Sequence, residues 1–541
     1  MRSSEALLFL GCLATPSASF TPSSQLNSHL NVRNNNSDRK WPSTKAAAIE
    51  HEKPTNFSSA VGQEADTTIT YVLDDGYDPA VAFNGESPVA DLAVNELLLN
   101  KEEEEFASGV PDLDGNPLST EYLAKHMGID NVESYTCPQE EVFRGFMSNG
   151  SRLRLQPGGQ TAFYKCIIFE HLSHAQEKLK NAPFKLARDA QSYEVVANFL
   201  KSRACQAVTE TTGVCIPKSY ISELRPNKAN PIQTKCSFLL EDLSPEEGWY
   251  QDWLFQDLEE TKTSLKTLAK IHAFFWHGSN FWKDQQAGSE LEAAVWESGS
   301  YVQPKAQNAD QCSNVAKEWK IKRTKFRDQL SSLDCWDDLG ERLQNVATEC
   351  GRLAHPFAND DFKESYQKFR TFTHGDPKQA NFLFRRSPSK GLEIGLIDFQ
   401  WAGFGLAATD IAHFMTSGVH ADLLVNGGEA KLLEYYFDEL QTHLVEYGAY
   451  DTAEDAVQQF SYETFMDQYE IGVLDLCRLM IAYTWDRFDK AVEPNDKVGC
   501  ARTMNKTSYN KSIPNVIWLI SRCDEIMRLQ EIKVAKMMLL G

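Results

Sequence analysis

Two short segments in the C-terminal half constrain the fold of this 541-residue chain more than any other feature: HGDPKQANFLF at 374–384 and LIDFQW at 396–401. Residues 381–386 and 392–399 have the apolar content of β-strands, and the Pro, Ser and Gly of 387–391 predict a turn between them. The sequence therefore predicts a β-hairpin in which the start of one strand lies beside the end of the other.

The polar residues of these segments have a spacing that suits phosphoryl transfer. His374, Asp376 and Asn381 fit the pattern His-x-Asp-x-x-x-x-Asn, and Asp398 ends the second strand. Moving a phosphoryl group from ATP to a hydroxyl needs a carboxylate that accepts the hydroxyl proton and oxygen ligands for Mg²⁺. We expect Asp376 to be that base and Asn381 with Asp398 to bind Mg²⁺. Lys378, two residues after Asp376, is expected to approach the transferred phosphate, as the corresponding lysine does in protein kinases.

A strand-rich stretch at 141–169 precedes these segments. Its alternating and apolar runs predict antiparallel strands around the Pro-Gly-Gly turn at 157–159. GFMSNGS at 145–151 is a candidate hairpin whose backbone N–H groups would cover phosphate, which makes Ser148 and Gly150 candidate ATP contacts. The segment lacks a full G-x-G-x-x-G, so this signal is weak by itself.

Lys165 interrupts an otherwise apolar strand of this stretch. An unpaired ammonium there would be costly to desolvate, and pairing with ATP phosphates and a helical carboxylate would remove that cost. The alternative is an edge-strand lysine that reaches solvent. The helix expected at 189–200 carries Glu194 as its only glutamate. Glu194 is therefore the candidate partner, with an ordinary solvated glutamate as an equal alternative.

A buried strand expected at 236–244 leads into an acidic segment that would connect two lobes. Backbone groups of such a connection hold the adenine in kinase-like folds. Three residues are candidate nucleotide contacts on this basis: Glu241, Asp242 and Leu243. A polar strand end is the alternative for the two acidic residues.

Helical patterns dominate the remaining sequence. A capped amphipathic helix is expected at 119–128, and residues 265–276 have apolar side chains at helical spacing. His272 in the second helix is expected to be buried and to support the catalytic loop. Residues 287–315 are polar and irregular, which predicts an insertion or surface loop. Further helices are expected at 316–353, 429–448, 452–490 and 515–532.

Composition excludes several classes of protein. The net charge of −22 argues against DNA or RNA as a partner, because binding a polyanion needs a basic surface. No segment approaches the apolar length of a membrane-spanning helix. The 12 cysteines are scattered without a C-x-x-C pair, so we expect neither a zinc site nor a dense disulfide framework.

The N-terminal region has the composition of a targeting sequence. Residues 1–20 have a basic Arg2, an apolar stretch and small residues, as in a secretory signal peptide. Residues 21–60 are a transit-peptide-like segment, and residues 61–118 predict an acidic linker. The combination resembles the bipartite plastid presequence of algae with secondary plastids, which implies import into a plastid. Secretion is the alternative, and Asn56 would then be a possible glycosylation site.

The chain also resembles the choline kinase/aminoglycoside phosphotransferase superfamily, and within it the ecdysteroid-kinase-like (CHK kinase-like) branch. The segments that carry the likeness are 239–243 (LLEDL), 268–276 (LAKIHAFFW), 374–384 (HGDPKQANFLF) and 396–414 (LIDFQWAGFGLAATDIAHF). This resemblance implies an α+β, bilobal protein-kinase-like fold. It implies a small antiparallel β-rich N-lobe at 119–241 and a larger, mainly helical C-lobe at 242–541.

The same resemblance implies roles for residues beyond the catalytic pair of motifs. It implies that Lys165 holds the ATP phosphates and that Asp410 braces the catalytic loop, with His374 in structural support. The chain departs from its relatives at Val196, where they commonly have the glutamate of the small-lobe helix. Glu194 is two positions away and points to another helical face.

Two functions remain open from the sequence. The first is an ATP- and Mg²⁺-dependent kinase that phosphorylates a hydroxyl of a small alcohol, choline-like or bulkier and sterol-like. The second is a pseudokinase that acts as a nucleotide-binding or scaffold module. A protein kinase is disfavoured, because only 11 residues separate Asp398 from Asp410 and no Ala-Pro-Glu follows. Trp401, Tyr469 and Trp485 are candidates for lining an acceptor pocket, with plain core packing as the alternative.

Overall fold

The computed structural model describes residues 110–137, 142–144, 149–251, 255–307, 313–325, 327–482 and 513–540. All of them fall within Asp78–Gly541, which belongs to a single compact unit. The expected signal peptide, the transit-peptide-like segment and most of the acidic linker lie outside the described residues. Two candidate site residues, Ser148 and Trp485, lie outside them as well.

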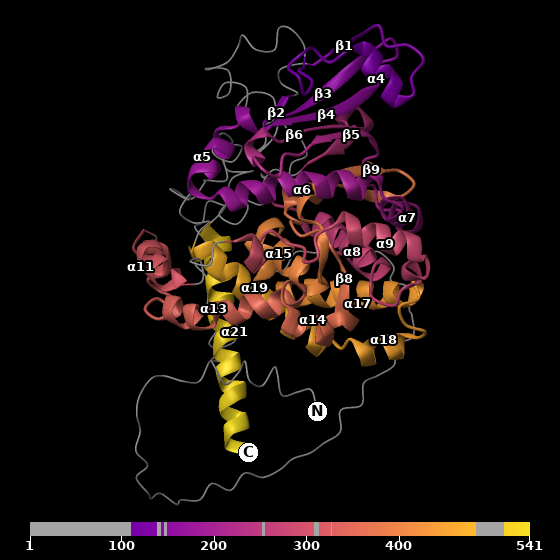
Figure 1. Ribbon diagram of the computed structural model, residues 1–541. Helices are drawn as coiled ribbons and strands as arrows, with labels where there is room; N and C mark the ends of the chain where they lie inside the picture. Colours follow the sequence, from indigo (N-terminus) through magenta and orange to yellow (C-terminus); the bar gives the residue numbers. More distant parts are fainter. Residues whose placement is uncertain are drawn as a thin grey trace, which may run out of the picture. The chain divides into compact units, whose positions relative to one another are not determined.

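An antiparallel sheet forms the N-lobe (Figure 1). Its strand order is β1-β3-β4-β6-β5, and β2 pairs with β3. The strands are β1 Ser134–Thr136, β2 Val142–Arg144, β3 Asn149–Gln156, β4 Thr161–Ile168, β5 Ser219–Arg225 and β6 Lys235–Glu241. The predicted Pro-Gly-Gly turn joins β3 to β4, and Gly158 and Gly159 give it the positive φ angles that other residues rarely adopt.

The predicted helix at the start of the N-lobe is α4, Thr120–Met127. Its first turn is capped by the Ser119 hydroxyl, which accepts the backbone N–H of Tyr122 at 3.1 Å. It ends at Gly128, whose φ of 71° is the left-handed conformation that glycine adopts without strain. The serine and glycine in the sequence therefore set both ends of this helix.

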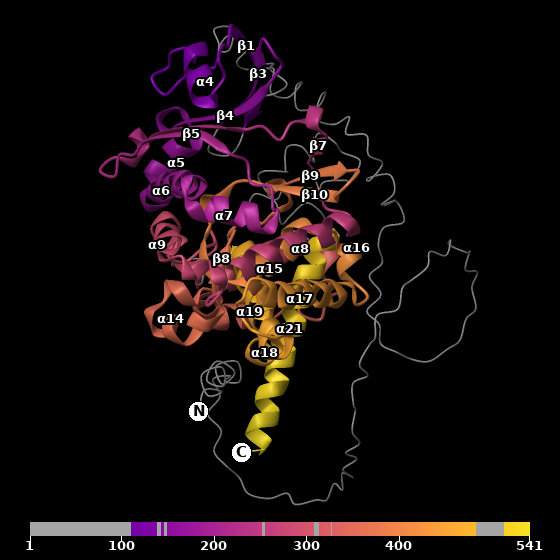
Figure 2. The same cartoon turned by 90° about the vertical axis from the view of Figure 1, so that its right-hand side faces the viewer.

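Helix α6, Pro183–Lys201, lies between the N-lobe sheet and the helices of the C-lobe (Figures 1 and 2). It is flanked in sequence by α5, Ser173–Asn181, and α7, Arg203–Thr212. Tyr193 of α6 belongs to the hydrophobic cluster under the N-lobe sheet. Phe199, less than two turns further on, belongs to the large cluster of the C-lobe. Helix α6 is therefore part of both cores.

Residues 110–118, which were expected to form the end of the acidic linker, pack onto the N-lobe instead. Val110 and Leu118 are 3% and 4% exposed and share a cluster with Leu123 of α4. The surrounding segment is acidic, and this composition predicted a linker rather than buried apolar residues. The packed part of the N-lobe thus includes residues before 119.

The C-lobe is mainly helical and contains two small sheets. One sheet has the order β10-β9-β7 and the other pairs β11 with β8. The strands are β7 Trp249–Tyr250, β8 Arg370–Thr373, β9 Phe382–Ser387, β10 Gly391–Leu396 and β11 Gly403–Leu406. The helices are α8 Leu258–Phe274, α9 Gln285–Ala294, α11 Val315–Lys325, α12 Arg327–Leu330, α13 Leu339–Ala354, α14 Asp360–Tyr366, α15 Ala407–Gly418, α16 Ala421–Leu424, α17 Gly428–Glu446, α18 Ala453–Gln459, α19 Tyr462–Ala482 and α21 Ile513–Leu540.

The predicted hairpin is confirmed as β9 and β10. The two strands pair antiparallel from Gly391 opposite Ser387 to Leu396 opposite Phe382. Gly391 closes the turn with a φ of 76°. This register places the residues just before β9 beside those just after β10, where the candidate magnesium ligands lie.

The prediction of an irregular surface loop at 287–315 is wrong for its first half. Helix α9 continues to Ala294, and most of the residues from 295 to 300 are buried, with backbone hydrogen bonds to residues 401–404 at the start of β11. Trp296 is 7% exposed and forms a bridge with Gly403 of β11. These contacts join parts of the chain about 100 residues apart, which local composition does not show.

These observations confirm the predicted fold class: a small antiparallel β-rich N-lobe is followed by a larger, mainly helical C-lobe. Among the helices that the structure describes, none combines the length and the apolar character needed to cross a membrane.

Candidate active site

The predicted catalytic loop, residues 374–381, carries Asp376 and Asn381. Its backbone is held by Asp410, in the first turn of α15. Its carboxylate accepts the backbone N–H of His374 at 2.6 Å and that of Gly375 at 3.0 Å. Nε2 of His272, on α8, lies 3.3 Å from the same carboxylate, and its Nδ1 contacts the hydroxyl of Tyr436. The structure thus brings together the three residues expected to support the loop.

The loop packs too closely on its neighbours to accept another residue at Gly375. Its φ is +78°, and a Cβ there would collide with the carbonyl oxygen of Trp401 and the backbone nitrogen of Ser300. On the other side of the loop, Nε2 of His374 lies 2.9 Å from the carbonyl oxygen of Ile397. The loop is therefore fixed between the end of β10 and the segment after it.

Asp376, the predicted base, is 8% exposed and holds contacts from two sides. Its Oδ2 accepts a hydrogen bond from Nζ of Lys378 at 2.9 Å, and its Oδ1 lies 3.4 Å from Nε2 of His413. Burial by itself would raise the pKa of Asp376. The ammonium of Lys378 and the hydrogen bond from His413 outweigh it and hold the pKa below its usual value. A carboxylate in this setting is ionised at neutral pH, as proton acceptance requires.

His413 is a site residue that the sequence reasoning missed. It lies on α15, three residues after Asp410, and is 2% exposed. Residues three apart project from the same side of a helix. That spacing is the signal that could have placed His413 beside the catalytic loop once Asp410 was assigned to it.

The two predicted magnesium ligands meet at the end of the hairpin. The side-chain N–H of Asn381 donates to the carbonyl oxygen of Asp376 at 2.7 Å, which fixes the amide. The backbone carbonyl of Asn381 accepts the N–H of Ile397 at 3.1 Å, next to Asp398 in sequence. Asp398 has a left-handed φ of 66°. The backbone bond between Asn381 and Ile397 places both candidate ligands at the same end of the hairpin.

The donor set fits a hard divalent cation. Within the part of the chain that the structure describes, Oδ1 of Asp398 is buried without a hydrogen-bond partner. Nζ of Lys165 lies 3.8 Å from this oxygen, beyond hydrogen-bonding distance, so the oxygen still lacks a hydrogen-bond donor among the described residues, and a metal ion would satisfy it. Carboxylate and amide oxygens are the ligands that Mg²⁺ takes in nucleotide sites. Asn381 and Asp398 are therefore suited to hold Mg²⁺.

Lys165 reaches the same site from the N-lobe. It lies on β4, opposite Gly150 of β3, and its Nζ is 3.8 Å from Oδ1 of Asp398. Gly150 itself is covered, since a Cβ there would collide with the ring of Phe163 on β4. The structure brings Lys165 and Asp398 together and leaves Gly150 behind the neighbouring ring.

The predicted pairing of Lys165 with Glu194 is not found. Glu194 is only half-buried on α6, and no ion pair joins it to Lys165 among the described residues. The other carboxylate of this helix, Asp189, pairs with Lys178 at 2.5 Å. The carboxylate beside Lys165 is Asp398 of the C-lobe.

The acidic side chains between the lobes are engaged with the N-lobe. Asp242 is 4% exposed, and its Oδ2 accepts a hydrogen bond from Nε of Arg152 on β3 at 2.6 Å. The Glu241 carboxylate accepts the backbone N–H of Lys218 at 3.0 Å. These carboxylates therefore have structural partners, and any nucleotide contact at 241–242 would come from the backbone.

Leu243 packs across the lobe boundary. It is 7% exposed, and its side chain lies over Gly395 of β10, where a Cβ would collide with it. Gly395 thus allows the segment between the lobes to lie directly on the hairpin of β9 and β10.

Aromatic side chains lie next to the catalytic loop. The rings of Trp296 and Trp401 stack with centroids 5.8 Å apart. The ring centroids of Tyr301 and Trp401 are 6.3 Å apart. Trp401 and Tyr301 are half-buried. Tyr469, in contrast, is fully buried and donates its hydroxyl to Glu429 at 2.8 Å, so it is a core residue.

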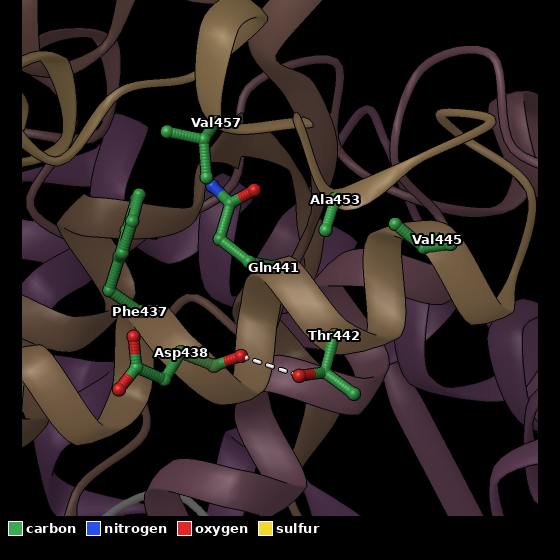
Figure 3. A pocket seen from close by; sticks show the side chains of 7 residues that line it. All are labelled: Phe437, Asp438, Gln441, Thr442, Val445, Ala453 and Val457. Atoms are coloured by element: carbon green, nitrogen blue, oxygen red, sulfur yellow. Dashed lines mark hydrogen bonds between the residues drawn. The ribbon is translucent and has the colours of Figure 1, made fainter. Parts of the chain in front are cut away.

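A separate pocket of about 500 Å³ lies between α17 and α18 (Figure 3). Phe437, Gln441 and Val445 line it from α17, and Ala453 and Val457 from α18. None of the predicted site residues lines this pocket. The candidate chemistry is therefore not located there.

A loop that carries Asp376, a hairpin that ends at Asn381 and Asp398, and a lysine from a β-rich N-lobe together have the layout of a kinase-like protein. The chain belongs to the ecdysteroid kinase-like family: the model of that family matches residues 167–449, which is 283 of 541 residues. This match confirms the resemblance seen in the motifs.

Solved structures of small-molecule kinases are similar to this chain over most of its length. An ethanolamine kinase from Plasmodium vivax is 13% identical, with a TM-score of 0.32, and the match covers 78% of this chain and 96% of that one. A putative aminoglycoside phosphotransferase from Ralstonia eutropha is 13% identical, with a TM-score of 0.33, covering 76% and 98%. An aminoglycoside phosphotransferase from Alicyclobacillus acidocaldarius is 12% identical, with a TM-score of 0.30, covering 73% and 92%.

No curated protein sequence matches the chain. The family assignment is carried by the match to the family model.

Proposed function

We propose that this protein is an ATP- and Mg²⁺-dependent small-molecule kinase that phosphorylates a hydroxyl group of an alcohol. The observation that carries the proposal is the meeting of two carboxylates and a lysine in one site: Nζ of Lys165 lies 3.8 Å from Oδ1 of Asp398, and that buried oxygen has no hydrogen-bond partner in the described residues. The charge of Lys378 and the hydrogen bond from His413 lower the pKa of the third group, Asp376. A base, a metal ligand and a phosphate-binding cation are the groups that phosphoryl transfer requires.

Each side chain has a distinct task in this proposal. Asp376 accepts the proton of the acceptor hydroxyl, and its orientation is fixed by Lys378 and His413. Asn381 and Asp398 hold Mg²⁺, which neutralises phosphate charge when bound. Catalysis of this kind is mainly positioning and charge stabilisation, which suits a loop fixed at its backbone.

The acceptor is proposed to be a choline-like alcohol or a bulkier, sterol-like one. The family to which the chain belongs is named for its likeness to ecdysteroid kinases, which supports an alcohol of the second kind. The half-buried rings of Trp401 and Tyr301 beside the catalytic loop would suit either an apolar or a cationic body.

The test is ADP release by the purified protein with Mg²⁺ and ATP against choline, ethanolamine, sterols, sugars and aminoglycosides. We expect one class of alcohol to raise turnover well above the rate without acceptor. Asp376→Ala and Asp398→Ala should each remove that acceptor-dependent turnover, because base and metal ligand are both required. Equal background turnover in the wild type and both variants would contradict the proposal.

A further inference from the structure

Neither carboxylate of α6 positions Lys165. Its ammonium is 3.8 Å from Oδ1 of Asp398, which is beyond hydrogen-bonding distance. Of the two carboxylates on α6, Asp189 is paired with Lys178, and no ion pair joins Glu194 to Lys165 in the described part of the chain. Another residue must therefore hold the lysine over the site.

Tyr193 of α6 lies where that group is needed. It is 1% exposed, and the centroid of its ring is 5.5 Å from Nζ of Lys165. A cation at this distance from an aromatic face is attracted by the negative face of the ring, and more strongly when water is excluded.

The hydroxyl of Tyr193 reaches the segment that follows the metal ligand. It is hydrogen-bonded to the side chain of Gln400, and the charge of Asp398 acts on it directly. One side chain thus contacts the phosphate-binding lysine through its ring and the residues after Asp398 through its hydroxyl. Burial raises the pKa of Tyr193 well above its usual value, so the hydroxyl stays protonated.

We propose that Tyr193 is the positioning residue of Lys165 in this protein, taking the place of the helical carboxylate and coupling α6 to the nucleotide-phosphate site. This inference rests on the proposed function, because it assigns Lys165 to ATP phosphates. It predicts that nucleotide affinity depends on the ring of Tyr193 only while Lys165 is present.

The experiment measures the Kd of Mg·ATP for the full-length protein by calorimetric titration. Tyr193→Leu, which removes the ring, should weaken binding about tenfold, and Tyr193→Phe, which keeps the ring, should change it less than about threefold. Phe169→Leu is the matched control: Phe169 is 0% exposed and packs against Tyr193 in the same cluster with centroids 6.0 Å apart. It should change the Kd less than about twofold.

A double-mutant cycle isolates the action through the lysine. In a Lys165→Met background, Tyr193→Leu should have no further effect on the Kd of Mg·ATP. Three results would each overturn the proposal. The first is a double variant whose increase in Kd is the product of the two single increases. The others are an increase in Kd for Phe169→Leu, or for Glu194→Gln, as large as that for Tyr193→Leu.

The two proposals fail in distinguishable ways. If the wild type does not bind Mg·ATP, the proposed function is wrong. The wild type, Tyr193→Leu, Lys165→Met and the double variant are then compared by the urea concentrations at which they are half unfolded. Non-additive shifts of the midpoint would support a direct contact between Tyr193 and Lys165, and additive shifts would overturn it.

Discussion

Asp376 is held in place by groups from two elements that are far apart in sequence. Lys378 belongs to its own loop, whereas His413 comes from α15, the helix that also supplies Asp410 to the loop backbone. The base and its loop are thus both anchored to one helix. This arrangement explains how a loop without regular secondary structure can hold a carboxylate in a single orientation.

Substitution of His413 should affect the chemical step rather than nucleotide binding. In His413→Leu, Asp376 loses one of its two donors, and we expect kcat to fall about 10- to 100-fold, within the range that general-base catalysis contributes. The Kd of Mg·ATP should change less than about twofold. Steady-state kinetics with the identified acceptor and nucleotide titration measure the two quantities.

Thr416→Val is the control for that substitution. Thr416 lies one turn further on α15, and among the described residues its hydroxyl bonds to carbonyls of the helix itself, those of Ala412 and His413. Its kcat should stay near the wild-type value. A similar loss of kcat in both variants would show that α15 is merely destabilised.

Gly375 and Gly391 offer a matched pair for testing the close packing of the catalytic loop. Both have positive φ, 78° and 76°, but a Cβ at Gly375 would collide with Trp401 and one at Gly391 meets nothing within 4 Å. Gly391→Ala should lower the free energy of unfolding by about 1 kcal/mol, the cost of the left-handed conformation. Gly375→Ala should cost more than about 3 kcal/mol, because the collision adds to it. Urea unfolding measures both, and equal losses would contradict the packing described.

At the scale of single residues, the sequence pointed to candidate reactive groups but not to all of their neighbours. Asp376, Asn381 and Asp398 could be predicted as candidates because phosphoryl transfer demands those side chains at that spacing. His413 and Tyr193 could not, because a histidine or tyrosine on an apolar helix face looks like ordinary core. Their importance comes from contacts across the fold, which a local pattern does not contain.

A buried charged cluster joins α13 to α19 in the C-lobe. Asp475 is 1% exposed and accepts a hydrogen bond from Nε of Arg478 at 2.6 Å, while Nε2 of His355 lies 3.1 Å from its other oxygen. Burial would raise the pKa of Asp475, but the charge of Arg478 and the hydrogen bond from His355 hold it below its usual value. The ionised carboxylate is therefore part of the joint between these helices.

Asp475→Asn should destabilise the protein in a pH-dependent way. At pH 7 it leaves the buried charge of Arg478 uncompensated, and we expect a loss of about 3–5 kcal/mol in the free energy of unfolding. Because the folded-state pKa is lowered, the contribution of Asp475 is present above the ordinary aspartate pKa and disappears as the pH falls through the folded-state value. The difference between wild type and variant in the free energy of unfolding should therefore become smaller below about pH 4.

Urea unfolding at a series of pH values provides the measurement. Asp361→Asn is the control, because Asp361 pairs with Arg352 of α13 at 3.0 Å at the surface, where its side chain is 75% exposed. Its effect should be small at every pH. A gap for Asp475→Asn that stays constant from pH 7 to pH 3 would contradict this assignment.

At the scale of elements, turn residues and apolar periodicity predicted the hairpin of β9 and β10 and helical segments that correspond to α8, α11, α13, α17, α19 and α21. The segment after α9 could not be predicted, because its burial depends on partners such as Gly403, far along the chain. Residues 110–118 show the same limit. Their apolar side chains find a surface that forms only when the sheet does.

At the scale of the whole molecule, the destination of the chain remains a prediction from residues 1–60, which lie outside the described part. A fluorescent protein fused after residue 60 should accumulate in the plastid of a host with a secondary plastid. The reason is the order of an apolar signal followed by a basic, hydroxylated stretch. Fluorescence microscopy provides the measurement, and an endomembrane signal with none in the plastid would support secretion instead.

Helix α6 contributes Tyr193 to the core under the N-lobe sheet and Phe199 to the core of the C-lobe. Neither core can lose its structure without removing packing from the other. The two lobes should accordingly melt as one cooperative transition, with a single calorimetric peak, and a ligand that tightens the nucleotide site should raise the melting temperature of the whole kinase region at once.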